Sequence, residues 1–223
     1  MLQQTDAWFA ERAKKITASR IADVMAFSPA GVYLSGKRKG QPKVVRPLKA
    51  RTDYIMQLAS ERLTGRPKNE IKASALEWGK EWEPIARAEY EVRTGSVVDV
   101  VGFVTHPVHD FIGASADFLV DDDGGGEIKC PKDQEVHLDT LENRLPREHI
   151  QQIQGNLWVS GRQWWDFVSY HHAFPVEHRI YIQRVMRDED YIAGMEAHCL
   201  AFEDEVRAVV AKYAAKAEFL EPA

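Results

Sequence analysis

The segment from Gly113 to Pro131, GASADFLVDDDGGGEIKCP, constrains the fold of this chain more than any other. Its apolar run at 118–120 predicts a strand, the acidic and glycine-rich run at 121–126 predicts a turn, and 127–130 predicts the returning strand. Because side chains alternate along a strand, Glu127 and Lys129 are expected on one face, which Asp117 can approach from the neighbouring strand. Two carboxylates and a lysine are therefore predicted to meet on a hairpin.

This grouping of charges suits a metal-dependent hydrolytic site. Paired carboxylates bind a hard cation such as Mg2+ through oxygen, and a nearby ammonium can orient a bound water or help to deprotonate it. The pattern resembles that of the PD-(D/E)xK nucleases, and the spacer between Asp117 and Glu127 lies inside the usual range of that superfamily. Taken alone, the same residues also fit a solvated hairpin edge that carries a salt bridge.

Length and composition favour one domain over residues 1–223, large enough to bury a core. The net charge of -5 means that a DNA-binding role would require the basic residues to be gathered in one place.

The two cysteines, Cys130 and Cys199, are too few for a disulfide framework or a four-cysteine metal site. No apolar run approaches the ~18 residues of a membrane span, and the N-terminal residues contain no apolar signal core. We therefore expect a cytoplasmic protein without a membrane segment.

A basic stretch interrupts this acidic chain. From residue 28 to 47, proline, glycine and basic residues replace any periodicity, which predicts a long loop. No acid occurs between residues 37 and 51, a pattern that indicates either a contact with a polyanion or a solvated flexible loop. The basic residues of this stretch are Lys37, Arg38, Lys39, Lys43, Arg46, Lys49 and Arg51.

Periodicity predicts further elements around the hairpin. Helices are expected over 6–15, 18–26, 48–63, 73–94, 147–159 and 188–217, strands over 96–105, 111–114, 163–172 and 178–187, and a loop over 132–146. N-caps are expected at Thr17, Ser74 and Asp188. Pro84 should kink or reset its helix at Glu83, so Glu83 is a candidate third metal ligand, with an ordinary surface glutamate as the alternative.

Two further groups could contact phosphate or water. Arg12 and Ser19 belong to the string W-x3-R-x3-ITAS, and a guanidinium beside a helix-start hydroxyl is suited to gripping a phosphate. Gln152 lies on a predicted helix, from which its amide could hold a water or a phosphate oxygen. A surface arginine, a helix-start serine and an inert surface glutamine are the simpler alternatives.

Four strings occur together in a fixed order: DAWFAERAKKITAS, ALEWGKEWEPIAR, GASADFLVDDDGGGEIKCP and HIQQIQGNLWV. With them the chain resembles the phage-type alkaline exonucleases of the lambda exonuclease family, also called YqaJ-like viral recombinases, over roughly residues 6 to 190. The resemblance implies an α/β fold with a central mixed β-sheet flanked by helices and a restriction-endonuclease-like core.

The resemblance also implies roles for individual residues. The metal ligands would be Asp117, Glu127 and the backbone carbonyl of Ile128, with Glu83 near a second metal. Lys129 would position the attacking water with the help of Gln152.

Three further residues, Arg12, Ser19 and Ser115, would bind the 5'-phosphate of a DNA end. Leu76 would be an apolar wedge between the terminal bases. Lys37, Arg38 and Lys39 could replace a groove-tracking arginine of the family, since Pro29 occupies that position here.

The chain departs from the family pattern at two positions beside the first aspartate. Phe118 replaces the usual glycine and could change the local turn, whereas Ala116 replaces the proline of the motif and should leave the chemistry unaffected.

The activity implied by the resemblance is 5'-to-3' degradation of one strand of linear double-stranded DNA to 5'-mononucleotides. It would require two Mg2+ ions per site, with Mn2+ as a substitute, and would leave 3' overhangs for phage-type homologous recombination. The implied partners are DNA ends, two further copies in a ring-shaped homotrimer and a single-strand annealing protein, in the cytoplasm of a bacterial host. Another PD-(D/E)xK endonuclease and a non-catalytic DNA-end-binding recombination scaffold are the alternatives.

Overall fold

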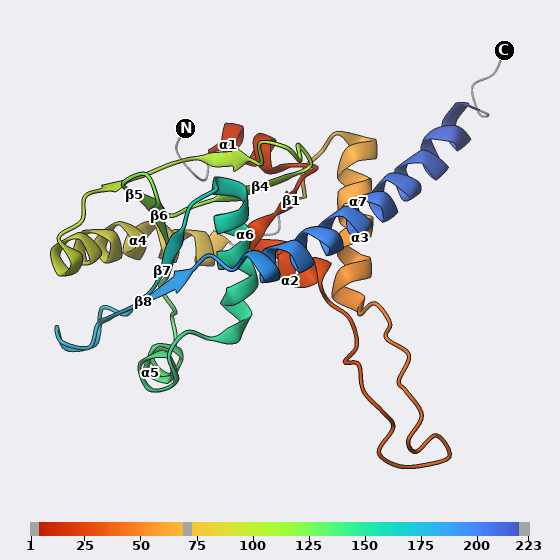
Figure 1. Cartoon of the computed structure of the whole chain (residues 1–223). Helices are drawn as coiled ribbons and strands as arrows, with labels where there is room; N and C mark the ends of the chain where they lie inside the picture. Colours follow the sequence, from red (N-terminus) through yellow and green to blue (C-terminus); the bar gives the residue numbers. More distant parts are fainter. Residues whose placement is uncertain (1–4, 69–72, 219–223) are drawn as a thin grey trace.

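The structure is a computed structural model that describes residues 5–68 and 73–218 (Figure 1). Its helices are α1 (Asp6–Arg12), η1 (Ala18–Arg20), α2 (Ile21–Val24), α3 (Lys49–Thr64), α4 (Ala73–Thr94), α5 (Gln134–Asn143), η2 (Arg147–His149), α6 (Ile150–Ser160) and α7 (Glu189–Glu218). Its strands are β1 (Ile16–Thr17), β2 (Val98–Asp99), β3 (Phe103–Thr105), β4 (Ile112–Ser115), β5 (Phe118–Val120), β6 (Gly124–Lys129), β7 (Trp164–Tyr170) and β8 (Ile180–Met186). In the described part of the chain, no helix has the length and apolar character that crossing a membrane requires.

The expected fold class is confirmed, but the strands form two mixed sheets where one was expected. The larger has the order β2-β5-β6-β7-β8, with β6 and β7 parallel and the other neighbours antiparallel. The smaller has the order β1-β4-β3. The strand expected over 96–105 is accordingly divided, because β2 pairs with β5 whereas β3 pairs with β4. Asp117 lies where the chain passes from the smaller sheet to the larger one.

Helices cover both faces of the larger sheet. Ala86 and Tyr90 of α4 pack with Phe118 and Val168 on one face. Ile153 of α6 packs with other sheet residues on the opposite face. A further buried cluster joins α2, α3 and α7 to the smaller sheet. Figure 1 shows α3 and α7 side by side at one end of the molecule, from which the loop at 28–47 projects.

The glycine run belongs to a strand, not to the turn predicted over 121–126. Only 121–123 form the turn, and β6 begins at Gly124. A Cβ added at Gly124 or Gly126 would lie 2.0 Å from an aromatic carbon of Trp164 or Phe118, respectively. Glycine is therefore required here because large rings on the neighbouring strands occupy the space of a side chain.

The prediction of a loop over 132–146 is wrong, because α5 occupies most of that segment. His137 of α5 is fully buried and bonds the Ser169 hydroxyl and the His178 carbonyl, each at 2.8 Å. One buried polar side chain thus fixes this helix to the sheet although the segment has little apolar periodicity.

The N-terminal helix is shorter than predicted. It ends at Arg12, and Lys14 takes a φ of 70°, which turns the chain into β1. The helix expected over 18–26 is divided into η1 and α2. Thr17 stands at its N-cap position without a side-chain capping bond, and its hydroxyl instead lies 3.2 Å from that of Ser19.

Three other helix predictions concern two caps and a proline. The cap at Asp188 is confirmed, because its carboxylate accepts a bond from the Tyr191 N–H at 2.9 Å. Pro84 lies inside α4, which continues through it from Ala73 to Thr94. The expected cap at Ser74 concerns a side chain outside the described residues.

Candidate active site

The first carboxylate is fixed by the backbone of the neighbouring strand. Asp117 lies between β4 and β5, where its Oδ2 accepts a hydrogen bond from the Ile128 N–H at 2.6 Å. Its own N–H donates to the carbonyl of Gly126 at 3.2 Å. Asp117 is thereby held beside β6, as the hairpin interpretation predicted.

The second carboxylate receives three side-chain donors. Glu127 is only 4 % exposed, and its Oε1 accepts from Lys129 Nζ at 2.7 Å and from Gln152 Nε2 at 2.5 Å. Lys129 Nζ also lies 3.3 Å from Gln152 Oε1. The shared face of Glu127 and Lys129 is confirmed by this contact, and α6 brings Gln152 to the same point.

Asn156 is a site residue that sequence reasoning missed. Its Nδ2 donates to Glu127 Oε2 at 3.3 Å, and its side chain is buried. Because it follows Gln152 by four residues, one turn of α6 places both amides on one helix face. That spacing in the string HIQQIQGN was the signal that could have revealed it.

Asp117, Glu127, Lys129 and Glu83 all line one open cavity of about 440 Å³. We call it the carboxylate pocket; its other lining residues are Trp78, Gly79, Ile128, Cys130 and Lys132. A Cβ at Gly79 would lie 2.9 Å from the Glu83 carboxylate, so glycine one turn earlier leaves room for that side chain. Glu83 thus lines the same pocket as the two hairpin carboxylates, and its role as a third metal ligand stays a prediction. Trp78, whose Nε1 donates to the Cys130 carbonyl at 2.8 Å, was not anticipated.

The carboxylates of this pocket oppose one another's ionisation. Burial, followed by the charges of Glu127 and Glu83, raises the pKa of Asp117 well above its usual range. Burial and then Glu127 raise the pKa of Glu83. Burial acts to lower the pKa of Lys129, but Glu127 and Asp117 together outweigh it and raise that pKa. Buried like charges of this kind are stabilised by a cation.

The oxygen donors suit a hard divalent cation in chemical type. In the described residues, however, no three His, Cys, Asp or Glu side chains are already arranged as a metal site. One oxygen of Asp117 is engaged by the Ile128 N–H, and one oxygen of Glu127 by Lys129 and Gln152. The donor set therefore fits such an ion, whereas the side chains are held by hydrogen bonds within the protein.

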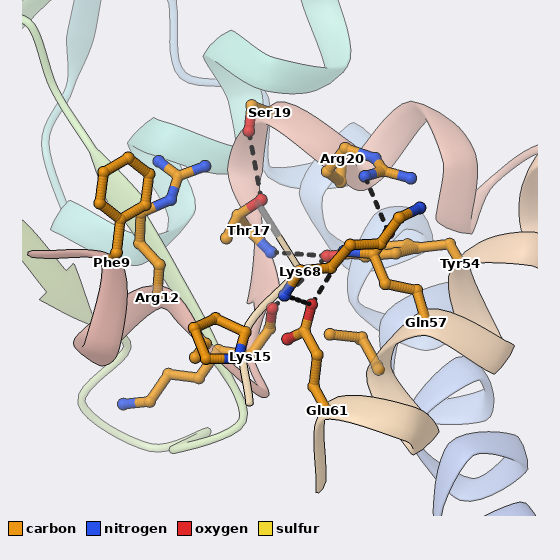
Figure 2. Close-up of a pocket in the computed structure, with 13 residues that line it drawn as sticks. Phe9, Arg12, Lys15, Thr17, Ser19, Arg20, Tyr54, Gln57, Glu61 and Lys68 are labelled. Atoms are coloured by element: carbon orange, nitrogen blue, oxygen red, sulfur yellow. Dashed lines mark hydrogen bonds between the residues drawn. The ribbon is translucent and has the colours of Figure 1, made fainter. Parts of the chain in front are cut away.

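A second cavity, of about 310 Å³, lies between α1 and α3 and is lined by both Arg12 and Ser19 (Figure 2). We call it the α1–α3 pocket. Ser115 is not among its lining residues, but its Oγ accepts a hydrogen bond from Trp8 Nε1 at 3.0 Å. Burial lowers the pKa of Arg12, and electrostatic interactions with Tyr54 and Glu127 partly offset this effect. Arg12 is thus close enough to the carboxylate pocket to sense Glu127.

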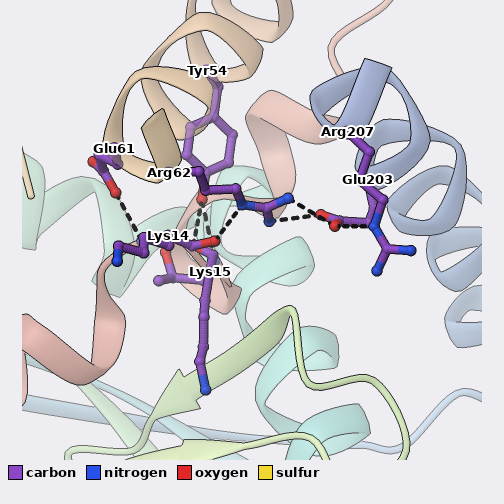
Figure 3. A network of polar contacts seen from close by, with 8 residues as sticks. Lys14, Lys15, Tyr54, Glu61, Arg62, Glu203 and Arg207 are labelled. Carbon is purple, nitrogen blue, oxygen red and sulfur yellow. Dashed lines mark hydrogen bonds and ion pairs between the residues drawn. The ribbon is translucent and has the colours of Figure 1, made fainter. Parts of the chain in front are cut away.

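The turn between Arg12 and Ser19 is clamped from α3 (Figure 3). The Lys14 N–H donates to Glu61 Oε2 at 2.9 Å, and Arg62 Nε donates to the Lys14 carbonyl at 3.0 Å. Arg62 also pairs with Glu203 of α7 at 2.7 Å. The left-handed conformation of a non-glycine residue costs about 1–2 kcal/mol, and these bonds hold Lys14 in it.

Tyr54 fixes the same segment from inside the protein. Its hydroxyl accepts from the Thr17 N–H at 3.2 Å and donates to the Lys15 carbonyl at 3.4 Å. Burial raises the pKa of Tyr54 to about 12, which keeps the hydroxyl neutral. The two residues proposed to grip phosphate therefore sit on a backbone that α3 holds in place.

Most of the basic stretch is exposed on the projecting loop of Figure 1: Lys37, Arg38, Lys39, Lys43 and Arg46. Arg51 was wrongly grouped with them. It is 2 % exposed, stacks between Phe27 and Phe202, and bonds the Val24 carbonyl at 2.6 Å. Lys49 forms an ion pair with Asp53 in the first turns of α3. Among the described residues of this stretch, the basic side chains without an ion pair therefore lie on the loop itself.

Leu76 belongs to α4, but its side chain lies outside the described residues, so the wedge stays a prediction. His171 and His172 have packing roles. His172 stacks on Trp82 with ring centroids 4.0 Å apart, and His171 is buried.

Comparison with known proteins gives a consistent result. Residues 7–163 match the family model of the YqaJ-like viral recombinase domain. The chain is similar to an alkaline exonuclease, LHK-Exo, from Laribacter hongkongensis, with 38 % identity, a TM-score of 0.83, and coverage of 97 % of this chain and 100 % of that one. A structure of LHK-Exo in complex with dAMP matches with 37 % identity, the same TM-score and the same coverage.

A phage-related exonuclease from Haemophilus somnus 129PT shares the fold, with 16 % identity and a TM-score of 0.68 over 89 % of this chain and 96 % of that one. None of the curated proteins compared with the chain matches it.

Proposed function

Since the chain belongs to the YqaJ-like viral recombinase family and is a homologue of an alkaline exonuclease, we propose that it degrades one strand of linear double-stranded DNA from the 5' end. The products would be 5'-mononucleotides and a 3' single-stranded overhang for phage-type recombination. The observation that carries this proposal is the link that Trp8 makes between the two pockets. Asp117 lines the carboxylate pocket, and Ser115, two residues earlier, accepts a hydrogen bond from Trp8, whose ring lies against Arg12 of the α1–α3 pocket.

The carboxylate pocket would hold two divalent cations, Mg2+ or Mn2+ as a substitute. Asp117, Glu127 and the Ile128 carbonyl would bind one, and Glu83 would help to bind the second. When bound, these ions would act as Lewis acids that stabilise negative charge on the scissile phosphate. Support comes from the oxygen donors that line this pocket and from the raised pKa values of Asp117 and Glu83.

Lys129 and Gln152 would orient the attacking water. The Lys129 ammonium and the Gln152 amide already lie within hydrogen-bonding distance of each other and of Glu127. Two converging polar groups can hold one water in line with a phosphorus atom. This positioning lowers the entropic cost of reaching the transition state. Asn156 would keep Glu127 in place during this step.

The direction of degradation would come from the α1–α3 pocket. With a terminal 5'-phosphate bound by Arg12, Ser19 and Ser115, the next phosphodiester would reach the carboxylate pocket, and each cleavage would release one 5'-mononucleotide. LHK-Exo has a complex with dAMP, which is such a nucleotide. Leu76 would separate the terminal base pair, an unstacking that costs a few kcal/mol.

We also propose the wider setting that the family suggests. The chain would act as a ring-shaped homotrimer around DNA, with a single-strand annealing protein as partner, in the cytoplasm of a bacterial host. The mass of the protein in solution tests the assembly directly, since a trimer of the 25.4 kDa chain is readily distinguished from a monomer.

A digestion assay tests the activity itself. We expect a linear duplex with labelled 5'-phosphate ends to release labelled mononucleotides when Mg2+ is present, and to remain intact with a chelator. A covalently closed circle of the same sequence should remain whole. Cutting of the circle would identify an endonuclease instead, and an intact linear duplex with Mg2+ or Mn2+ would indicate a non-catalytic end-binding protein.

A further inference from the structure

Trp8 contacts two of the three residues assigned to the 5'-phosphate. Its indole Nε1–H donates to Ser115 Oγ at 3.0 Å, across 107 residues of sequence. The guanidinium carbon of Arg12, one turn later on α1, lies 4.1 Å from the centroid of the Trp8 ring. The side chain is 4 % exposed, and Phe9 packs edge-on against it with centroids 4.9 Å apart. One fixed ring therefore joins α1 to the end of β4.

The hydrogen bond from Trp8 determines what Ser115 can offer to a ligand. An indole N–H is a donor only, so Ser115 must accept with its oxygen. Its own hydroxyl proton is then left to be donated elsewhere, and the hydroxyl loses the freedom to turn its oxygen toward the ligand. A serine held in this way is suited to an anion.

The contact with the Trp8 ring likewise prepares Arg12 to bind an anion. A guanidinium that lies over an aromatic face keeps the N–H groups of its edge available for a bidentate contact with phosphate. Among the described residues no acid forms an ion pair with Arg12, whereas Arg20, which lines the same pocket, is paired with Asp23. Trp8 thus holds the arginine without neutralising it.

We propose that Trp8 is the positioning residue of the 5'-phosphate site, which orients the Ser115 hydroxyl as a donor and holds the Arg12 guanidinium flat, with its edge toward the anion. This inference rests on the proposed function and extends it to a residue that would not itself touch the DNA. Because Ser115 precedes Asp117 by two residues, the same ring also fixes the distance between end recognition and the carboxylate pocket.

The test is Trp8→Phe, which keeps an aromatic face for Arg12 but removes the N–H. The measurement is kcat/KM on duplexes that differ only in a 5'-phosphate or 5'-hydroxyl end. One hydrogen bond corresponds to roughly a fivefold to tenfold effect, so we expect the preference for 5'-phosphate to fall by that factor. The rate on the 5'-hydroxyl end should change little. Trp158→Phe, at another buried tryptophan outside both pockets, is the matched control and should leave the preference unchanged.

A double-variant cycle separates positioning from simple packing. If Trp8 acts through Ser115, adding Trp8→Phe to Ser115→Ala should reduce the preference no further than Ser115→Ala alone. Fully additive losses, or an unchanged preference in a folded Trp8→Phe protein, would overturn the inference while leaving the exonuclease proposal intact. Equal wild-type rates on the two ends would remove the 5'-phosphate site and the inference with it.

Should Trp8→Phe fail to fold, Arg12→Lys tests the contact between the Trp8 ring and residue 12 instead. It retains the charge but loses the flat stack, and we expect a clear fall in the preference for 5'-phosphate. A preference equal to that of wild type would contradict the assigned role of the ring.

Discussion

The carboxylate pocket and the α1–α3 pocket are linked by the electrostatic effect of Glu127 on Arg12, but they are built by opposite means. In the first, burial and then the neighbouring carboxylates raise the pKa values of Asp117 and Glu83. In the second, the Arg12 cation is held by a neutral ring and lies beside hydroxyls. The charge of each pocket is only partly balanced within the protein, so one is suited to cations and the other to an anion. A DNA end with bound metal ions would supply both.

Removal of the lysine in the carboxylate pocket should have the largest effect. We expect Lys129→Ala to lower kcat by roughly 100-fold to 10,000-fold, the range for loss of a group that positions or transfers a proton. Metal and DNA binding should be largely retained, because the carboxylates remain and lose a competing cation. Single-turnover digestion together with calorimetric Mn2+ titration checks both statements.

The matched control for this variant is Lys132→Ala. Lys132 lines the same pocket, and its Nζ lies 5.5 Å from the centre of the Trp78 ring. A much smaller loss is expected. Similar losses for the two variants would show that the pocket needs positive charge in general and not a positioned ammonium.

Removal of the arginine from the other pocket should have an intermediate effect that depends on the substrate. Hydrogen bonds to a charged group are worth about 1.5–3 kcal/mol, which corresponds to roughly 10-fold to 100-fold. We expect Arg12→Ala to lower kcat/KM by that factor on 5'-phosphate ends and to have little effect on 5'-hydroxyl ends. Steady-state kinetics on the two substrates measures the difference.

Arg20→Ala provides the contrast within the same pocket. Arg20 is engaged by Asp23 and Gln57 and stacks on Tyr54, so its charge is already used within the protein. Its loss should not change the preference between the two ends. If Arg20→Ala abolished that preference and Arg12→Ala did not, the 5'-phosphate contact would have to be assigned to Arg20 instead of Arg12.

The grouping of the charged side chains in the carboxylate pocket could be predicted from the sequence more completely than the framework around it. Alternation along a strand correctly placed Glu127 with Lys129, because that rule depends only on backbone geometry. Ser115 was assigned through the family resemblance, but its bond to Trp8 spans two distant segments that no local spacing reveals. The position of Asn156 could also have been predicted, because it follows Gln152 by four residues and therefore lies on the same face of the helix.

The prediction of the framework was wrong where tertiary contacts override local preference. A run of three glycines predicts a turn, but the rings of Trp164 and Phe118 make it a strand. Arg51 looked like part of a DNA-binding surface until the fold placed it between two phenylalanine rings. In both cases the deciding neighbours are remote in sequence, so composition over a short window misleads.

Removal of the basic side chains of the projecting loop should have the smallest effect on activity. That effect should also depend least on whether the DNA end carries a phosphate or a hydroxyl. Lys37, Arg38 and Lys39 are exposed on it, and none of them lines either pocket. Contacts of this kind with phosphates release counterions, and each one lost reduces the slope of log K against log salt by about 1. We expect the triple alanine variant to lower that slope by at most about 3, with kcat at saturating DNA unchanged and the preference for 5'-phosphate retained.

Lys49→Ala is the control for the loop, since Lys49 belongs to the same basic stretch but is paired with Asp53 on α3. Its salt slope should equal that of wild type in a fluorescence-anisotropy titration. Loss of the 5'-phosphate preference in the triple variant would mean that the loop reaches the α1–α3 pocket. An unchanged salt slope would mean that the loop does not contact DNA, and that the two pockets alone hold the substrate. Because the three sites are expected to affect kcat, end preference and salt slope separately, each can be contradicted without the others.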